Sequence, residues 1–298
     1  MKKNVLIINY NTQKLTEACI KSVNKFTPGC TIYVFDNSDN ENFINNFNNV
    51  IVMNNTSGQI IDFKTWLEKY KQKERSTGKI NNWASAKHSY SVETFMKIIG
   101  EPFLLLDSDV LLKKDVSELF ESSVCCVGES VFQGKKSKIQ RILPFITYIN
   151  TPLCKEKGIH YFDENYMNGL KVSITGDKYD TGAAFFLSMK QSNINHREIK
   201  TEDFIVHFGG GSWLKKFEKL SRKKHISVDE WLEKNRDLWD ENLDGNLTEV
   251  SRKSTPEPES RHVPPEEKVM PVVKKKEVEV KYLKMAKTSD RKIGVLKR

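Results

Sequence analysis

The chain has 298 residues, of which 38% are hydrophobic, so it is long enough for one large domain or two small ones. Residues 251–298 carry 14 basic and 7 acidic side chains, whereas residues 1–250 carry 34 and 32, so the net charge of +9 arises mainly in the C-terminal segment. Nucleic-acid-binding proteins usually carry a basic surface on the folded domain, and the nearly neutral body therefore argues against a specific nucleic-acid partner.

Five cysteines are present without any C-x-x-C spacing, so we predict buried free thiols in place of a disulfide framework or a zinc site. The N-terminal apolar run, Val5–Ile8, is shorter than the roughly 7–15 residues of a signal-peptide core. No segment approaches the roughly 18 apolar residues of a membrane span. These features predict a cytoplasmic protein, and the basic tail leaves open a peripheral position at the inner face of the membrane.

The first 53 residues alternate between apolar runs and an amphipathic segment. Val5–Ile8 is typical of a strand buried on both faces of a parallel sheet. Thr12 is expected to cap a helix whose apolar face combines four residues at helical spacing, Leu15, Cys19, Val23 and Phe26. Strands are expected again at Thr31–Phe35 and Val50–Met53. This order predicts an α/β fold with a mostly parallel central sheet flanked by helices.

Further elements follow in chain order. Amphipathic segments predict helices over residues 60–75 and 84–99 and helical material over residues 213–239. Short apolar runs predict four more strands, over residues 103–106, 124–127, 183–187 and 204–206. Residues 129–180 lack clear periodicity and are expected to be irregular.

Two carboxylates, Asp107 and Asp109, follow directly after the apolar run Phe103–Leu106. In an open α/β sheet, ligands bind at the carboxyl ends of the strands, which is where this run would deliver both acids. Residues two apart on an extended chain point the same way, so both carboxylates can reach one cation. Hard oxygen ligands beside a phosphate suit Mn²⁺ or Mg²⁺. A solvated turn or a helix cap is the alternative interpretation of such a D-x-D motif.

A family resemblance is carried by residues 4–38, NVLIINYNTQKLTEACIKSVNKFTPGCTIYVFDNS, and by the string LLLDSDV. Residues 4–38 resemble the opening of GT-A glycosyltransferases, particularly family 2, and LLLDSDV resembles the D-x-D motif of that fold. The resemblance covers roughly residues 4–215. It implies a metal-dependent enzyme that moves a sugar from a nucleoside-diphosphate sugar, expected to be a UDP-sugar, to a hydroxyl of a glycan, lipid-linked or other acceptor.

The resemblance also assigns residues at the ends of the first two strands. It implies that Asn9, Tyr10 and Asn11 lie near the nucleobase and that Asp36 contacts the base or the ribose. These residues also end parallel strands at the expected ligand edge of the sheet. Turn chemistry is the alternative for the two asparagines, and a capped turn is the alternative for Asp36.

His207 follows an apolar run and precedes the string Phe-Gly-Gly-Gly-Ser-Trp. Glycines let a backbone approach a ligand closely, and a neutral imidazole is a good metal ligand. The string resembles the late element with which many GT-A enzymes complete their metal site, which implies a site formed by Asp107, Asp109 and His207. The other histidines, His88 among them, lack this setting. A satisfied core histidine is the alternative.

The start of the helix predicted over residues 84–99 precedes the D-x-D strand. The corresponding GT-A segment often contacts the nucleotide or the donor sugar. Ser85 is expected to cap this helix, whose N-terminus would favour a phosphate, and Lys87 is expected to pair with the diphosphate. An exposed first helical turn is the alternative.

Asp180 stands in an Asp-Thr-Gly sequence just before a run of small and apolar residues. Family 2 often has an acidic pair at this point, from which this sequence departs. We predict that Asp180 is the acceptor-side catalytic carboxylate. It would deprotonate the acceptor hydroxyl in an inverting transferase, or position the sugar in a retaining one. Other acids compete for this role: Asp163, Glu164, Asp177, Glu202 and Asp203.

The predicted glycosyltransferase domain spans residues 1–245, with a nucleotide-binding half over residues 1–128 and an acceptor-side half over residues 129–245. Residues 246–298 hold five of the nine prolines and one aromatic residue, so they are expected to form a mostly disordered basic tail. We predict that this tail is a solvated linker, with weak contact to an anionic surface as the alternative.

Other functional classes fit less well. The turn after the first predicted strand lacks the G-x-G-x-x-G of dinucleotide enzymes, and no P-loop is present. A sugar-nucleotide pyrophosphorylase shares the α/β layer but usually has a Gly- and Arg-rich loop after its first strand, which is missing here. A non-catalytic binding module acting through the basic tail is the third alternative, and the intact set of Asp107, Asp109 and His207 argues against it.

Overall fold

The computed structural model describes residues 2–39, 41–66, 68, 83–120, 123–133, 137–162, 180–209 and 226–240. All of these residues belong to the compact unit Met1–Arg252. A helix begins at Phe63, as the pattern over residues 60–75 predicts, but most of that segment lies outside the described residues. Residues 213–225 and the predicted tail over residues 246–298 lie outside them too, so those assignments stay predictions.

Within the described residues, seven strands form the central sheet in the order β10-β6-β9-β4-β1-β2-β3. Their bounds are Asn4–Asn9 (β1), Thr31–Asp36 (β2), Val50–Asn54 (β3), Phe103–Asp107 (β4), Cys126–Gly128 (β6), Ile146–Ile149 (β9) and Arg197–Glu198 (β10). β1 pairs in parallel with β2 and β4, β2 with β3, and β6 with β10, whereas β9 runs antiparallel to β4 and β6. The predicted α/β fold with a mostly parallel sheet is confirmed.

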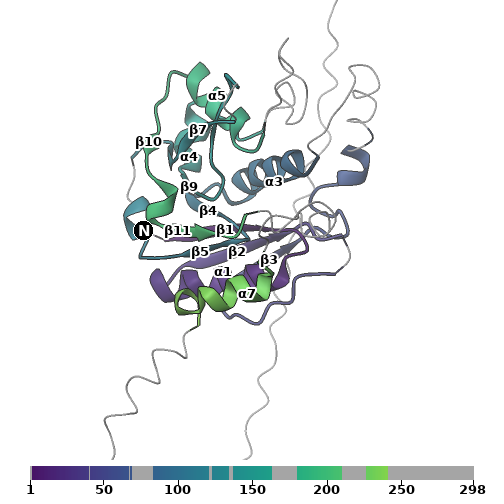
Figure 1. Ribbon diagram of the computed structural model, residues 1–298. Coiled ribbons are helices and arrows are strands. Elements are labelled where there is room, and N and C mark those ends of the chain that lie inside the picture. Colours follow the sequence, from purple (N-terminus) through teal and green to yellow (C-terminus); the bar gives the residue numbers. More distant parts are fainter. Residues whose placement is uncertain are drawn as a thin grey trace, which may run out of the picture. The chain divides into compact units, whose positions relative to one another are not determined.

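Helices cover both faces of this sheet (Figure 1). On one face lie α1 (Gln13–Phe26) and α7 (Val228–Lys234), and on the other lie α3 (Trp83–Ile99), α4 (Thr151–Glu156) and α5 (Ala183–Gln191). Two antiparallel ribbons accompany the sheet: β5 (Val110–Leu112) with β11 (Ile205–His207), and β7 (Ser130–Phe132) with β8 (Gln140–Ile142). Short 3-10 turns complete the described elements: η1 (Ser117–Leu119), η3 (Thr201–Asp203) and η5 (Arg236–Leu238).

The side chains of the central strands alternate between two hydrophobic cores. Val5 and Ile7 of β1 pack in the core shared with α1, whereas Leu6 and Ile8 pack in the core shared with α3. Because successive side chains of a strand point to opposite faces, a strand that is buried on both sides needs an unbroken apolar run. This alternation also decides which helix the residues at the strand ends will meet.

The segment Ala183–Leu187, predicted as a strand, is a helix in the structure, because α5 spans Ala183–Gln191. A short apolar run is compatible with either element, and here alanine, leucine, methionine, lysine and glutamine favour the helix over β-structure. The predicted irregular region holds regular elements, since β7, β8, β9 and α4 all lie between residues 129 and 157.

Thr12 occupies the N-cap position of α1, but its side chain makes no capping hydrogen bond. Its hydroxyl instead lies 2.8 Å from Asn9 Oδ1 and 2.9 Å from Ser108 Oγ. The predicted position of Thr12 is therefore right, but the predicted capping hydrogen bond is wrong, because the hydroxyl contacts these two polar partners instead. A link between α1 and the D-x-D motif takes the place of the cap.

All five cysteines are buried and free, as predicted. Burial raises the pKa of the Cys30 thiol to about 11, and a nearby lysine only partly opposes this effect. Among the described residues, none of the helices combines the length and the apolar composition that a bilayer crossing requires.

Gly182 offers a test of the packing between α5 and β8. Its φ is +79°, and a Cβ there would lie 2.0 Å from the carbonyl oxygen of Ile142. We expect Gly182→Ala to lower the free energy of unfolding by more than ~3 kcal/mol, measured by urea denaturation, because backbone strain and a backbone clash add.

The matched control is Gly158→Ala. Gly158 has a φ of +65°, but no atom lies within 4 Å of the added Cβ. This variant should lose about 1 kcal/mol from backbone strain alone. Equal losses for the two variants would contradict the role assigned to the Ile142 carbonyl.

Candidate functional site

The candidate site begins where β4 reaches the carboxyl edge of the sheet. β4 ends at Asp107, which lies opposite Ile8 of β1. Ser108 and Asp109 form a turn, and β5 starts at Val110. The two carboxylates thus do not lie on one extended strand, contrary to our sequence-based reasoning. Their carboxylates still lie close together on the two sides of this turn.

The ribbon of β5 and β11 brings His207 to this turn. His207 lies opposite Val110 in the antiparallel register, and the N–H of Phe208 donates to the carbonyl oxygen of Asp109 at 2.9 Å. Backbone pairing therefore fixes the histidine beside an aspartate that precedes it by 98 residues in the chain. The pairing was not foreseen, because β5 has only three residues and gives no distinct pattern.

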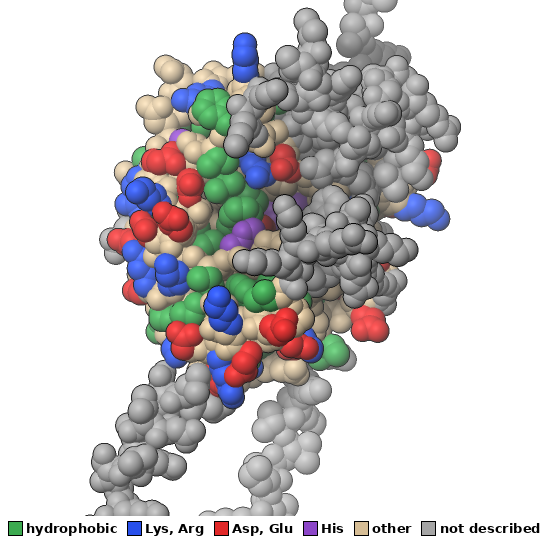
Figure 2. Space-filling view, in the orientation of Figure 1, with side chains coloured by type: hydrophobic (Ala, Val, Ile, Leu, Met, Phe, Trp, Pro, Cys, Tyr) green, Lys and Arg blue, Asp and Glu red, His purple; other side chains and the backbone are tan. Residues whose placement is uncertain are grey.

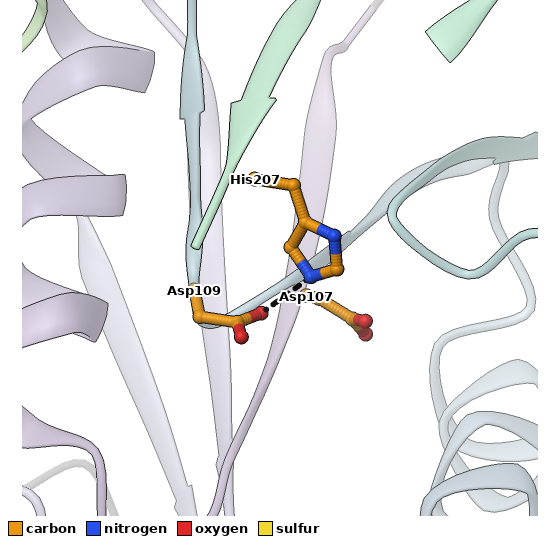
Figure 3. Close-up of side chains that lie close together, drawn as sticks. All are labelled: Asp107, Asp109 and His207. Atoms are coloured by element: carbon orange, nitrogen blue, oxygen red, sulfur yellow. Dashed lines mark hydrogen bonds and ion pairs between the residues drawn. The ribbon is translucent and has the colours of Figure 1, made fainter. Parts of the chain in front are cut away.

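Asp107, Asp109 and His207 each offer one ligand atom, and these atoms all lie within 4.8 Å of one another. Figure 3 shows the three side chains close together, with the Asp109 carboxylate beside the imidazole and His207 Nε2 3.2 Å from Asp109 Oδ1. Ligands about 2.1 Å from an octahedral cation are about 3 Å apart, so small side-chain rotations would bring the three ligand atoms to that spacing and leave three positions of the shell open. The geometry fits a divalent cation.

The charges around His207 also favour a bound cation. Burial lowers the pKa of the imidazole, but the hydrogen bond with Asp109 and the charges of Asp109 and Asp107 outweigh burial, so the pKa is raised overall. The Phe145 ring packs against the imidazole with ring centroids 4.0 Å apart. Two carboxylates thus create a local field that attracts positive charge to this point.

The cluster lies in a cavity of about 400 Å³. Both predicted halves of the domain contribute to its wall: Tyr10, Ser85 and Lys87 come from the first half, and Arg141 and Asp180 come from the second. Figure 2 shows histidine side chains in the middle of this face of the molecule, next to hydrophobic side chains. The cavity wall therefore combines apolar side chains with polar and charged ones.

Lys87 and Tyr10 line the cavity, and Lys87 contacts both Tyr10 and Asp39. Lys87 Nζ lies 3.5 Å from Asp39 Oδ1, and it lies 5.2 Å from the centre of the Tyr10 ring. Burial, followed by the hydrogen bond and charge of Asp39, raises the pKa of Tyr10 to about 12. Both predicted residues thus reach the cavity, and they are held there by a shared carboxylate.

Ser85 also lines the cavity, but it is not the helix cap that we predicted. α3 begins at Trp83, so Ser85 lies inside the first turn. Its hydroxyl oxygen lies 2.8 Å from Thr181 Oγ1, next to Asp180. Ser85 therefore connects α3 to the segment that carries the predicted catalytic carboxylate.

Three of the predicted nucleotide-binding residues do not line the cavity. Asp36 is fully buried, and it accepts hydrogen bonds from Asn9 Nδ2 at 2.8 Å and from the Phe43 N–H at 2.7 Å. Asn9 is also buried, and Asn11 is exposed with a φ of 55°. Protein groups thus satisfy Asp36 and Asn9 in this conformation, and nucleotide contact by these three residues stays a prediction.

Asp180 lies in the cavity wall beside Arg141. Arg141 Nη1 donates to Asp180 Oδ2 at 2.5 Å, and the Thr181 N–H donates to Asp180 Oδ1 at 2.8 Å. Arg141 was not predicted as a site residue, because the pattern around β8 is too short to place it on an element. The ion pair fixes the direction of the predicted catalytic carboxylate.

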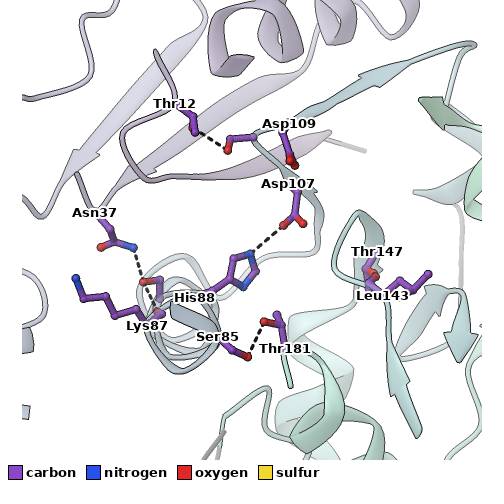
Figure 4. A network of polar contacts seen from close by, with 12 residues as sticks. Thr12, Asn37, Ser85, Lys87, His88, Asp107, Asp109, Leu143, Thr147 and Thr181 are labelled. Carbon is purple, nitrogen blue, oxygen red and sulfur yellow. Dashed lines mark hydrogen bonds and ion pairs between the residues drawn. The ribbon is translucent and has the colours of Figure 1, made fainter. Parts of the chain in front are cut away.

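His88 is the second cavity residue that sequence reasoning missed. Its Nε2 atom lies 3.1 Å from Asp107 Oδ1, as the network in Figure 4 shows. A usable signal was present, because His88 follows Ser85 by three residues and therefore shares its helix face.

No protein-family model and no curated protein matches the chain. Among solved structures, it resembles the apo-form glycosyltransferase GlyE of Streptococcus pneumoniae TIGR4, with 12% identity and a TM-score of 0.44 over 83% of this chain and 64% of GlyE. It also resembles the galactosyltransferase LgtC in complex with donor and acceptor sugar analogs, with 12% identity and a TM-score of 0.42 over 66% of this chain and 73% of LgtC.

A third similar structure is the bifunctional glycosyltransferase WbbM, with 11% identity and a TM-score of 0.38 over 67% of this chain and 39% of WbbM. All three are glycosyltransferases. The chain spans less than two thirds of the length of GlyE. The similarity is distant, and we infer the function from the site itself.

Loss of one cluster carboxylate tests the metal site. We expect Asp109→Asn to weaken Mn²⁺ binding by more than about 100-fold, since even the loss of an outer hydrogen-bond partner of a ligand typically costs 10–100-fold. Electron paramagnetic resonance of free Mn²⁺ during a titration measures this change. The control is Asp203→Asn, an exposed acid in η3, which should bind Mn²⁺ like the wild type. Unchanged affinity in Asp109→Asn would exclude this residue as a ligand.

Proposed function

We propose that the protein is a glycosyltransferase of the GT-A kind that uses a nucleoside-diphosphate sugar and a divalent cation. The supporting observation is the convergence of Asp107, Asp109 and His207 in a cavity at the carboxyl edge of parallel strands. That edge is where open α/β sheets bind nucleotides. UDP-sugars are the first donors to test, and the acceptor would be a hydroxyl of a glycan, a lipid-linked molecule or a similar compound.

The three cluster residues would hold Mn²⁺ or Mg²⁺, because paired carboxylates favour a hard cation and a neutral imidazole adds a third ligand. Such a cation supplies neutralisation of the negative charge that develops on the leaving diphosphate. Lys87 lies in the wall of the same cavity and would add a second positive charge to the diphosphate side. Tyr10, whose ring faces the Lys87 ammonium, would contact the nucleoside.

Asp180 would act at the acceptor end of the cavity. Its side chain is 38% exposed, and its two carboxylate oxygens accept hydrogen bonds from Arg141 and from the Thr181 N–H. We propose that Asp180 takes the proton of the acceptor hydroxyl as that oxygen bonds to the anomeric carbon. The bond from the anomeric carbon to the diphosphate oxygen breaks, and its electron pair leaves with the diphosphate.

A panel of nucleotide sugars tests the proposed function. With Mn²⁺ and no acceptor, the purified protein should slowly release free nucleoside diphosphate from at least one donor, measured by a coupled phosphate assay or chromatography. Asp109→Asn should release none above background. Synthesis of a nucleotide sugar from a nucleoside triphosphate and a sugar phosphate would instead support a pyrophosphorylase, and the absence of both reactions would support a binding module.

Asp180→Asn separates the acceptor step from donor binding. General-base catalysis typically contributes 10²–10⁴-fold, so kcat for sugar transfer should fall by about that factor. Donor affinity, measured by calorimetry with the nucleoside diphosphate, should stay near the wild-type value. A matched control is Asp237→Asn, an exposed acid in η5 that lies outside the cavity lining and should keep the wild-type kcat. An unchanged kcat in Asp180→Asn would show that another acid acts as the base.

A further inference from the structure

His88 lies in the second turn of α3 and contacts the metal cluster from outside it. Its Nε2 atom is 3.1 Å from Asp107 Oδ1, and the two side chains are only 17% and 20% exposed. In β4, Phe103 and Leu105 pack in the core shared with α3, and Asp107 continues that alternation. Asp107 therefore leaves the sheet on the side of α3, where His88 meets it.

The hydrogen-bond chemistry at His88 is defined by its partner. A carboxylate only accepts, so Nε2 carries the hydrogen and donates it to Asp107. The other ring nitrogen, Nδ1, is buried and has no hydrogen-bond partner among the described residues. A buried, unsatisfied polar atom lowers the stability of the fold, and an apolar side chain at this position would avoid that cost. The contact with Asp107 is thus what the imidazole contributes here.

The two histidine–aspartate contacts of the site differ in what a cation would do to them. His207 Nε2 and Asp109 Oδ1 face each other at 3.2 Å, and both residues belong to the ligand set, so their mutual hydrogen bond would give way to metal coordination. His88 is not part of the ligand set, and its bond engages Asp107 Oδ1 from the side of α3. This contact can persist when a cation is held through the other carboxylate oxygen.

We propose that His88 is a positioning residue that orients the Asp107 carboxylate for metal binding. This inference rests on the proposed metal site. Ligating carboxylates are commonly fixed by hydrogen bonds from outside the ligand set, and loss of such a partner weakens metal binding 10–100-fold. The bond also connects the metal ligand to the helix that carries Lys87, the residue proposed to meet the diphosphate. The position of α3 and the orientation of Asp107 are therefore linked through one side chain.

The test uses two substitutions of the same residue. His88→Leu removes the donor and keeps an apolar volume, whereas His88→Gln keeps an N–H near the position of Nε2. In a Mn²⁺ titration of the full-length protein followed by electron paramagnetic resonance, we expect His88→Leu to bind about 10–100-fold more weakly than the wild type. His88→Gln should stay within about threefold of the wild type, because the hydrogen bond to Asp107 is preserved.

His160→Leu is the matched control. His160 Nδ1 lies 3.3 Å from Glu93 Oε1, so this variant removes another histidine–carboxylate contact to α3, away from the cluster. Its Mn²⁺ affinity should equal that of the wild type. Thermal unfolding of each variant, without metal, checks that the fold is retained.

Three outcomes decide between the proposals. Equal Mn²⁺ affinity of His88→Leu and the wild type would overturn the positioning role while leaving the metal site intact. Equal weakening in His88→Leu, His88→Gln and His160→Leu would overturn it as well, because a general disturbance of α3 would then explain the loss. Absence of Mn²⁺ binding in the wild type itself would refute the proposed metal site, and the role of His88 with it.

Discussion

The candidate site depends on holding two carboxylates close together beside an imidazole. Like charges at this separation repel, and burial of Asp109 strengthens the repulsion because less water screens it. The structure opposes this repulsion with backbone pairing, since β4 holds Asp107 and the ribbon of β5 and β11 holds Asp109 and His207. His207 and His88 contact the two carboxylates, and a bound cation would offset the remaining repulsion.

The alternation of side chains in the central strands distributes polar residues between two environments. Asn9 follows Val5 and Ile7 toward α1, where its amide oxygen accepts hydrogen bonds from Thr12 and Thr16. Asp107 follows the opposite alternation toward α3 and the cavity. The same rule that buries the apolar run of each strand thus sends one polar end residue into a structural network and another into the site.

The hydrogen bonds around Asn9 connect the end of β1 to the turn that carries the metal cluster. The amide group of Asn9 donates to Asp36 and accepts from Thr12, and the Thr12 hydroxyl contacts Ser108, the central residue of the D-x-D turn. Buried polar groups that are satisfied by one another define their geometry closely. The ends of β1 and β2 therefore help to fix the turn that presents Asp107 and Asp109.

The sequence by itself determined the α/β class, the central strands and the polar groups at their ends, because continuous apolar runs and the D-x-D motif are local patterns. It misassigned Ala183–Leu187, which lies in helix α5, since a short apolar run is compatible with a strand or a helix. Only the tertiary structure showed that Asp36 is enclosed by protein donors and that His88 and Arg141 reach the cavity. These facts depend on which distant segments of the chain come together in the fold, and such long-range contacts cannot be recognised from a local sequence pattern.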